Sequence, residues 1–167
     1  MLAHCDFVYA GESAKFPLPF VNLALVPEFG SSYLLPLRFG YTRAAELILL
    51  GKPFDALRAA EFGLVTQVVP DQNLLATATE TARTLAAKSA SAVQATKRLM
   101  KRALREQLEQ AVKLESEVFA ERVRSDECEA SVPGILRQAP AGNYAVRPPD
   151  SVGLLSLNFA DVDHHFS

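Results

Sequence analysis

Residues 17–26 form an apolar run, Pro17-Leu18-Pro19-Phe20-Val21-Asn22-Leu23-Ala24-Leu25-Val26, which ends beside a single carboxylate in the segment Pro27-Glu28-Phe29-Gly30-Ser31-Ser32. A carboxylate among apolar groups loses part of the solvation of its charged form, which favours a group that can both take and return a proton. Glu28 is therefore a candidate proton shuttle. In a structural alternative, Pro27 and Glu28 simply open a helix, because proline suits the first helical position and an acid suits the positive end of the dipole.

The composition is that of an ordinary globular domain. The 167 residues are 49% hydrophobic and 22% charged, with a formal net charge of −2, and this length is enough for one domain with a core. The densest basic stretch, residues 97–105, is followed by acids. We interpret it as a solvated helix face, with binding of a phosphorylated ligand as the minority alternative. No nucleic-acid partner is expected, because no basic face dominates.

The remaining composition signals concern compartment, membrane and metal. Two cysteines, Cys5 and Cys128, do not make a disulfide framework, which favours a reducing cytoplasm. The N-terminus does not resemble a secretory signal, and prolines interrupt the longest apolar run, so no membrane association is expected. The adjacent His164 and His165 are weak evidence for a metal site, and no metal is predicted.

The pattern of apolar and turn residues predicts an α/β chain that becomes mostly helical. Residues 1–5 are interpreted as the last turn of a helix, 6–10 as a strand, and 20–25 as extended or irregular chain. A helix is predicted over 31–37, stopping near Pro36 and Gly40, a second over 42–50 capped by Thr42, and a third over 56–62 capped by Asp55. A strand over 64–69 and three long helices from residue 71 follow. The expected division is 1–70, 71–129 and an irregular tail over 130–167.

Four segments occur in an order that a known family shares: residues 4–16, 19–27, 43–65 and 95–100. The family is the crotonase (enoyl-CoA hydratase/isomerase) superfamily. The first two segments resemble its strand after the oxyanion helix and its substrate-pocket segment. The third resembles the helix, turn and strand that follow, and the fourth resembles the opening of its C-terminal helical region. The match spans residues 1–129. The resemblance implies a partial crotonase-like spiral of ββα units, followed by a C-terminal helical region that packs against neighbours in a homo-oligomer, a trimer or hexamer.

The resemblance also implies an activity. The family binds acyl-CoA thioesters, with coenzyme A as part of the substrate and no separate cofactor, and two backbone N–H groups polarise the thioester carbonyl. Hydratases of the family use two glutamates. This chain has Phe20 at the position of one of them, and it has Glu28 where hydratases usually have a small residue.

This pattern resembles the Δ3,Δ2-enoyl-CoA isomerase branch, in which one carboxylate removes a proton from C2 of a 3-enoyl thioester and returns it at C4. Glu28 is then the predicted catalytic base. The resemblance implies five substrate-binding residues: Phe20, Leu25, Pro27, Phe29 and Gly30. Of these, Phe20, Leu25 and Phe29 are expected around the acyl chain, and backbone groups near Phe29 and Gly30 are expected to shape the pocket.

Two alternatives to the isomerase remain open. The first is an enoyl-CoA hydratase or another crotonase chemistry. The second is a non-catalytic fragment or assembly module, because the family's N-terminal half, which carries both oxyanion donors, has no counterpart in residues 1–167. Without those donors we do not expect the chain to polarise a thioester by the family's mechanism. The C-terminal side also departs from the family pattern at Val132-Pro133-Gly134.

Overall fold

The computed structural model describes residues 1–131 and 154–157, so the histidine pair at 164–165 and the departure at 132–134 lie outside the described residues. The chain divides into two compact units. Of the described residues, unit 1 contains 1–15, 55–103 and 154–157, and unit 2 contains 16–54 and 104–131. Both units therefore draw on residues from either side of residue 70. No helix in the described part of the chain is long and apolar enough to cross a membrane.

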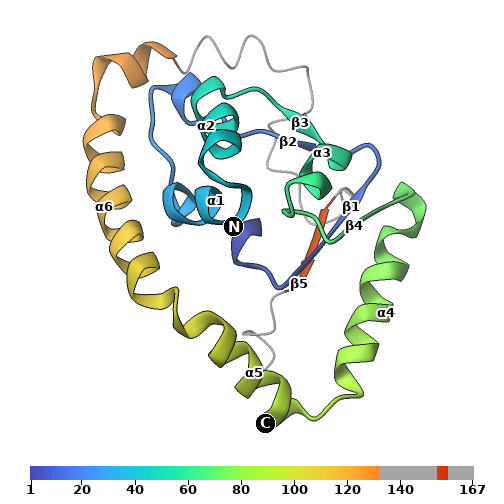
Figure 1. The fold of residues 1–167 in the computed structure, drawn as a ribbon. Helices are drawn as coiled ribbons and strands as arrows, with labels where there is room; N and C mark the ends of the chain where they lie inside the picture. The colour runs from blue at the N-terminus through green and yellow to red at the C-terminus, as the bar shows by residue number, and fades with distance from the viewer. Residues whose placement is uncertain (132–153, 158–167) are drawn as a thin grey trace. The chain divides into compact units, whose positions relative to one another are not determined.

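Unit 1 is built on the strand β1 (Phe7–Gly11), which lies between two others in the order β4-β1-β5 (Figure 1). The strand β4 (Gln67–Val69) pairs with it in parallel, and the strand β5 (Leu154–Leu157) pairs with it in antiparallel. Residues 8–11 are buried, as expected for a central strand. The interpretation of 130–167 as an irregular tail is corrected at 154–157, because this apolar segment pairs with the edge that β1 would otherwise leave open.

The helical elements of unit 1 follow the sequence pattern closely. They are η1 (Leu2–His4), α3 (Ala56–Glu61), η3 (Asp71–Asn73), α4 (Leu74–Ala86) and α5 (Ala90–Arg102). The predicted cap of α3 is confirmed, since the Asp55 carboxylate accepts a hydrogen bond from the Arg58 N–H at 2.9 Å. A core cluster of Tyr9, Val69, Leu74 and Ala78 packs α4 against the sheet.

Unit 2 is mainly helical. Its elements are η2 (Val21–Leu23), α1 (Ser31–Phe39), α2 (Tyr41–Leu50), α6 (Arg105–Val123) and a helical stretch over 126–131. The helix α1 packs against α2 and against α6, which runs beside it as the long yellow-orange helix of Figure 1. The short strands β2 (Lys15–Phe16) and β3 (Phe54–Asp55) pair, and the rings of Phe16 and Phe54 stack with centroids 5.5 Å apart.

Three sequence predictions in unit 2 are corrected. The helix α1 runs past Pro36 and the predicted end at residue 37 to Phe39, and the predicted stop at Gly40 is confirmed as its C-cap. Burial of Leu34, Leu35 and Phe39 outweighs the one backbone hydrogen bond that proline removes. The N-cap of α2 is Gly40, so Thr42 lies inside the helix. Residues 21–23 form one 3₁₀ turn within the segment expected to be extended or irregular, closed by backbone hydrogen bonds to the carbonyls of residues 19–21.

Candidate functional site

Glu28 lies in unit 2, on the connection between η2 and α1. Its carbonyl accepts a hydrogen bond from the Ser31 N–H at 3.0 Å, which closes a tight turn over Phe29 and Gly30. Both of these residues are left-handed, with φ of 55° and 71°. The helix α1 begins only at Ser31 with Gly30 as its N-cap, so the alternative in which Pro27 and Glu28 open the helix is wrong.

The turn places Glu28 in partly apolar surroundings. Glu28 is half-buried, as are Val26 and Pro27, while Phe29 is 52% exposed. Within the described residues, no hydrogen bond or ion pair engages the Glu28 carboxylate. Its acceptor oxygens are therefore available to a ligand rather than committed to the fold.

The other predicted pocket residues fall into two groups in the structure. Pro27, Phe29 and Gly30 flank Glu28 along the turn. Phe20 and Leu25 are joined by their backbones, because the Leu25 N–H donates to the Phe20 carbonyl at 2.8 Å across the 3₁₀ turn. Both are half-buried. The predicted set thus occupies one continuous segment of unit 2.

Sequence reasoning missed Glu115 on α6. Its Oε2 accepts a hydrogen bond from the Gly30 N–H at 2.6 Å and its Oε1 accepts one from the Ser32 N–H at 2.7 Å. Glu115 is only 6% exposed. The signal for it was present, because Glu115 follows Ala111 and Val112 by four and three residues and so lies on the apolar stripe of its helix. A charged residue at such a position calls for a buried partner.

A second residue of α6 contacts the other end of the same segment. The Arg122 Nε donates to the Ala24 carbonyl at 2.9 Å, and Ala24 itself is left-handed, with φ of 54°. Arg122 also pairs with Glu127, and that hydrogen bond raises the pKa of the guanidinium. The helix α6 therefore holds the pocket segment on both sides of Glu28.

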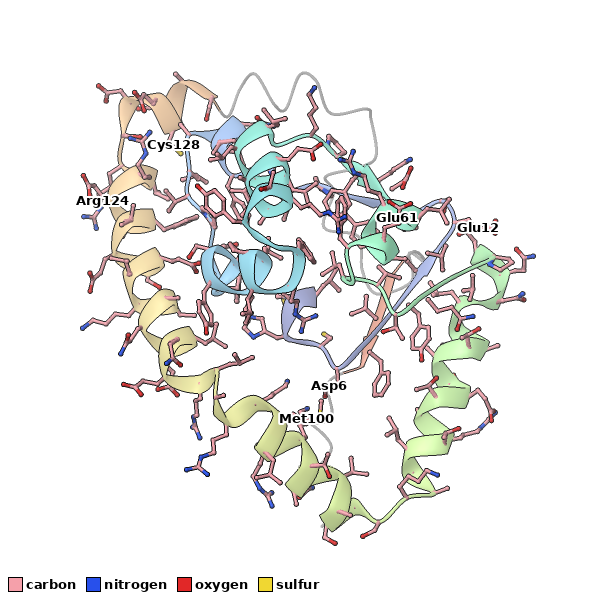
Figure 2. The ribbon with its side chains drawn as sticks, viewed as in Figure 1. Asp6, Glu12, Glu61, Met100, Arg124 and Cys128 are labelled. Carbon is pink, nitrogen blue, oxygen red and sulfur yellow. The ribbon has the colours of Figure 1, made fainter. Side chains whose placement is uncertain are left out.

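The basic stretch is only partly the solvated face that the sequence suggested. In unit 1 the Asp6 carboxylate pairs with the Nζ atoms of Lys97 and Lys101 at 2.6 and 3.1 Å, and Lys101 also donates to the His4 carbonyl. The Lys97 side chain is only 22% exposed. Figure 2 shows Asp6 at the start of β1, on the side that faces α5. These lysines tie η1 and β1 to α5.

Other features of the described chain add no competing site. No cluster of three or more histidines, cysteines and acids that could hold a metal occurs among residues 1–131. One surface hollow of unit 1 runs along η3 and α4, past Gln72, Ala76, Thr79, Glu80 and Arg83. None of the predicted site residues lines this hollow.

Comparison with known proteins places the chain in a family. The family model described as enoyl-CoA hydratase/isomerase matches residues 1–139. A probable enoyl-CoA hydratase from Mycobacterium bovis is 35% identical over 137 residues, covering 81% of this chain and 53% of that protein. Enoyl-CoA delta isomerase 2 from Rattus norvegicus is 31% identical over 140 residues, covering 84% of this chain and 36% of that protein.

Solved structures agree with the sequence comparison. The crystal structure of an enoyl-CoA hydratase/isomerase from Pseudoalteromonas atlantica superposes with a TM-score of 0.79 at 39% identity, covering 86% of this chain and 58% of that one. The chain belongs to the enoyl-CoA hydratase/isomerase family, and the predicted α/β fold with a partial crotonase spiral is confirmed. The chain spans about half the length of the curated relatives it matches.

Proposed function

We propose that this chain acts on 3-enoyl-CoA thioesters as a Δ3,Δ2-enoyl-CoA isomerase, with Glu28 as the single proton shuttle. The observation that supports this proposal is an unengaged carboxylate at the end of the apolar pocket segment, while a different acid, Glu115, takes the structural position at the start of α1. A carboxylate that is free of structural partners can serve as a base.

The reaction needs one base and no cofactor beyond the coenzyme A of the substrate. The Glu28 carboxylate removes a proton from C2, which lies between the thioester carbonyl and the C3–C4 double bond. The electron pair of the C2–H bond spreads over the dienolate, with its charge on the thioester oxygen. The protonated Glu28 then returns the proton at C4, which leaves the double bond between C2 and C3. This oxyanion needs backbone N–H donors. Because the family's own donors have no counterpart in residues 1–167, the proposal requires other backbone N–H groups of this chain to take their place.

A hydratase is the second candidate function. The relative that is 35% identical is named a probable enoyl-CoA hydratase, which favours this candidate. Several other curated relatives also carry hydratase names. Water must be activated as well as a proton delivered in that reaction, which favours two acids. The chain carries Phe20 where the resemblance implies the second acid, and this residue argues for the isomerase.

The two candidates are separated by giving the purified chain each substrate in turn. Isomerisation of a 3-enoyl-CoA creates a conjugated thioester and raises its absorbance, whereas hydration of a 2-enoyl-CoA removes the conjugation and lowers it. We expect turnover of the first substrate only. Glu28→Gln should lose this turnover. Its matched control is Glu12→Gln, because Glu12 is an exposed acid in unit 1 and the substitution removes the same charge. Hydration as fast as isomerisation, or no turnover of either substrate by folded protein, would contradict the proposal for this chain.

A further inference from the structure

Glu115 has no role in the reaction steps proposed above. Among the residues whose burial the structure describes, it is the single buried side chain that is polar or charged. It is not one of the residues predicted to contact substrate, and both of its oxygens already accept hydrogen bonds from the backbone of residues 30 and 32. Any effect on chemistry must therefore pass through that backbone.

The two hydrogen bonds straddle the junction between the turn and α1. The first N–H groups of a helix have no partner within the helix, and Gly30, the N-cap of α1, has no side chain to offer one. A carboxylate suits this place because its charge complements the positive end of the helix, and charge-assisted bonds of this kind are short and strong. Glu115 thus fixes the start of α1 from a different helix.

The turn needs such external support. Phe29 has a side chain and a positive φ, a conformation that persists only where the surroundings enforce it. Gly30 lies against α6, since a Cβ built there would clash with Leu108 Cδ1 and lie 3.4 Å from Val112 Cγ2. Glu28 is the residue directly before this pair, so the direction of its side chain depends on the same dihedral angles.

The contacts come from one face of α6. Leu108, Glu115 and Arg122 are spaced seven residues apart, which is close to two helical turns. Leu108 approaches Gly30, Glu115 binds the amides of Gly30 and Ser32, and Arg122 binds the carbonyl of Ala24. This stripe therefore holds the segment from residue 24 to residue 32, and Glu28 lies in its middle.

We propose that Glu115 is a positioning residue for the acid–base group: by binding the amides of Gly30 and Ser32 it holds the turn in the form that directs Glu28 toward the substrate. The inference rests on the proposed function of Glu28. Glu115 itself exchanges no proton with the substrate and touches none of its atoms.

The test compares Glu115→Gln with Glu117→Gln, an exposed acid two residues further along the same helix. Glutamine keeps the size of the side chain but presents an NH₂ group to one backbone N–H, so one of the two bonds is lost. We expect hydrogen exchange of the Gly30 and Ser32 amides to accelerate by at least tenfold. We also expect kcat for isomerisation to fall by about ten- to a hundredfold, as for a misplaced reacting group, with KM changed less than about twofold. Glu117→Gln should leave all three quantities at the wild-type level.

Glu115→Asp is the second variant, because it keeps both acceptor oxygens on a side chain shorter by one methylene. It should show intermediate exchange and intermediate kcat, and it carries the test alone if Glu115→Gln does not fold. Wild-type exchange at both amides in the folded variants would overturn the inference. Faster exchange with an unchanged kcat, in a protein whose Glu28→Gln variant is inactive, would also overturn it. A fully active Glu28→Gln variant would instead refute the proposed function, while the exchange result still reports on Glu115 by itself.

Discussion

At the scale of single residues, the site depends on backbone conformations that only a few side chains tolerate. Phe29 and Ala24 are left-handed without being glycine, which costs each of them about 1 kcal/mol. Both lie within the pocket segment. The Ala24 carbonyl accepts a hydrogen bond from Arg122 of α6, and Phe29 precedes Gly30, whose N–H donates to Glu115 of α6. Strain of this kind is typical of functional sites, where the surrounding structure holds a residue against its preference.

Gly30 provides the sharpest test at this scale. Gly30→Ala adds a Cβ to a residue with φ of 71° and forces it against Leu108 Cδ1. We expect a loss of about 2 kcal/mol in the free energy of unfolding, measured with urea. The matched control is Gly63→Ala, because Gly63 also has a positive φ but no atom within 4 Å of the added Cβ. Its cost should stay near 1 kcal/mol. Equal losses in the two variants would contradict the close packing of Gly30 on α6.

At the scale of elements, α5 and α6 use charged residues to hold particular segments. In unit 2, α6 binds the pocket segment through Glu115 and Arg122. In unit 1, α5 binds the start of β1 through Lys97, Lys101 and Asp6. Burial pushes the pKa of Asp6 up, but the hydrogen bonds and charges of the two lysines outweigh it, and the pKa lies below its ordinary value.

This lowered pKa predicts a pH dependence of stability. Because the folded-state pKa lies below the unfolded value of 3.8, the contribution of Asp6 is fully present above about pH 4 and is lost as the pH falls through the folded-state pKa. The variant Asp6→Asn lacks this contribution at every pH. The difference in urea unfolding free energy between wild type and variant should therefore shrink from pH 6 toward pH 3, the range in which an aspartate titrates. A difference that stays constant or grows over this range would contradict the ion pairs.

Rules for helix caps and apolar stripes predicted which helices and strands occur better than they predicted where each one ends. The cap at Asp55 and the stripes of the long helices follow from the chemistry of single turns, so the sequence could predict them. The continuation of α1 through Pro36 depends on burial of Leu34 and Phe39, which local rules do not contain. The strand β5 depends on pairing with β1, a partner about 145 residues away in the sequence.

The candidate site could likewise be predicted from the sequence only in part. Glu28 could be predicted because it stands out in a continuous apolar segment and because that segment resembles the isomerase branch. Glu115 could not be assigned a role, since its partners are 83 and 85 residues away along the chain. A buried charge on a helix stripe indicates that a partner exists, but the sequence does not say which amides it binds.

At the scale of the whole molecule, we propose that the chain works as a homo-oligomer, as its family resemblance implies. Large apolar side chains are exposed on α5, with Leu99 at 71% and Met100 at 74%. Figure 2 marks Met100 on this helix. Exposed apolar surface of this kind favours association.

Sedimentation of the purified chain tests the oligomer. We expect a species of three or six chains of 18.2 kDa each. The variant Met100→Asp should shift it toward smaller species, because a charge replaces an apolar contact. The control is Arg98→Asp, which also introduces an acid but lies on the opposite side of the helix, two residues earlier. A wild-type chain that sediments as a monomer at all concentrations would contradict this prediction.

In the proposed isomerase, Glu28 is the single acid–base group of the reaction. The most direct test of this role is the turnover of a 3-enoyl-CoA by wild type and by Glu28→Gln, with the affinity of each protein for a saturated acyl-CoA measured in parallel. We expect kcat to fall at least about a hundredfold, because a general base is removed. The affinity should change by less than about twofold, since the amide fills the same space as the acid. A Glu28→Gln variant that keeps most of its turnover would show that Glu28 is not the base.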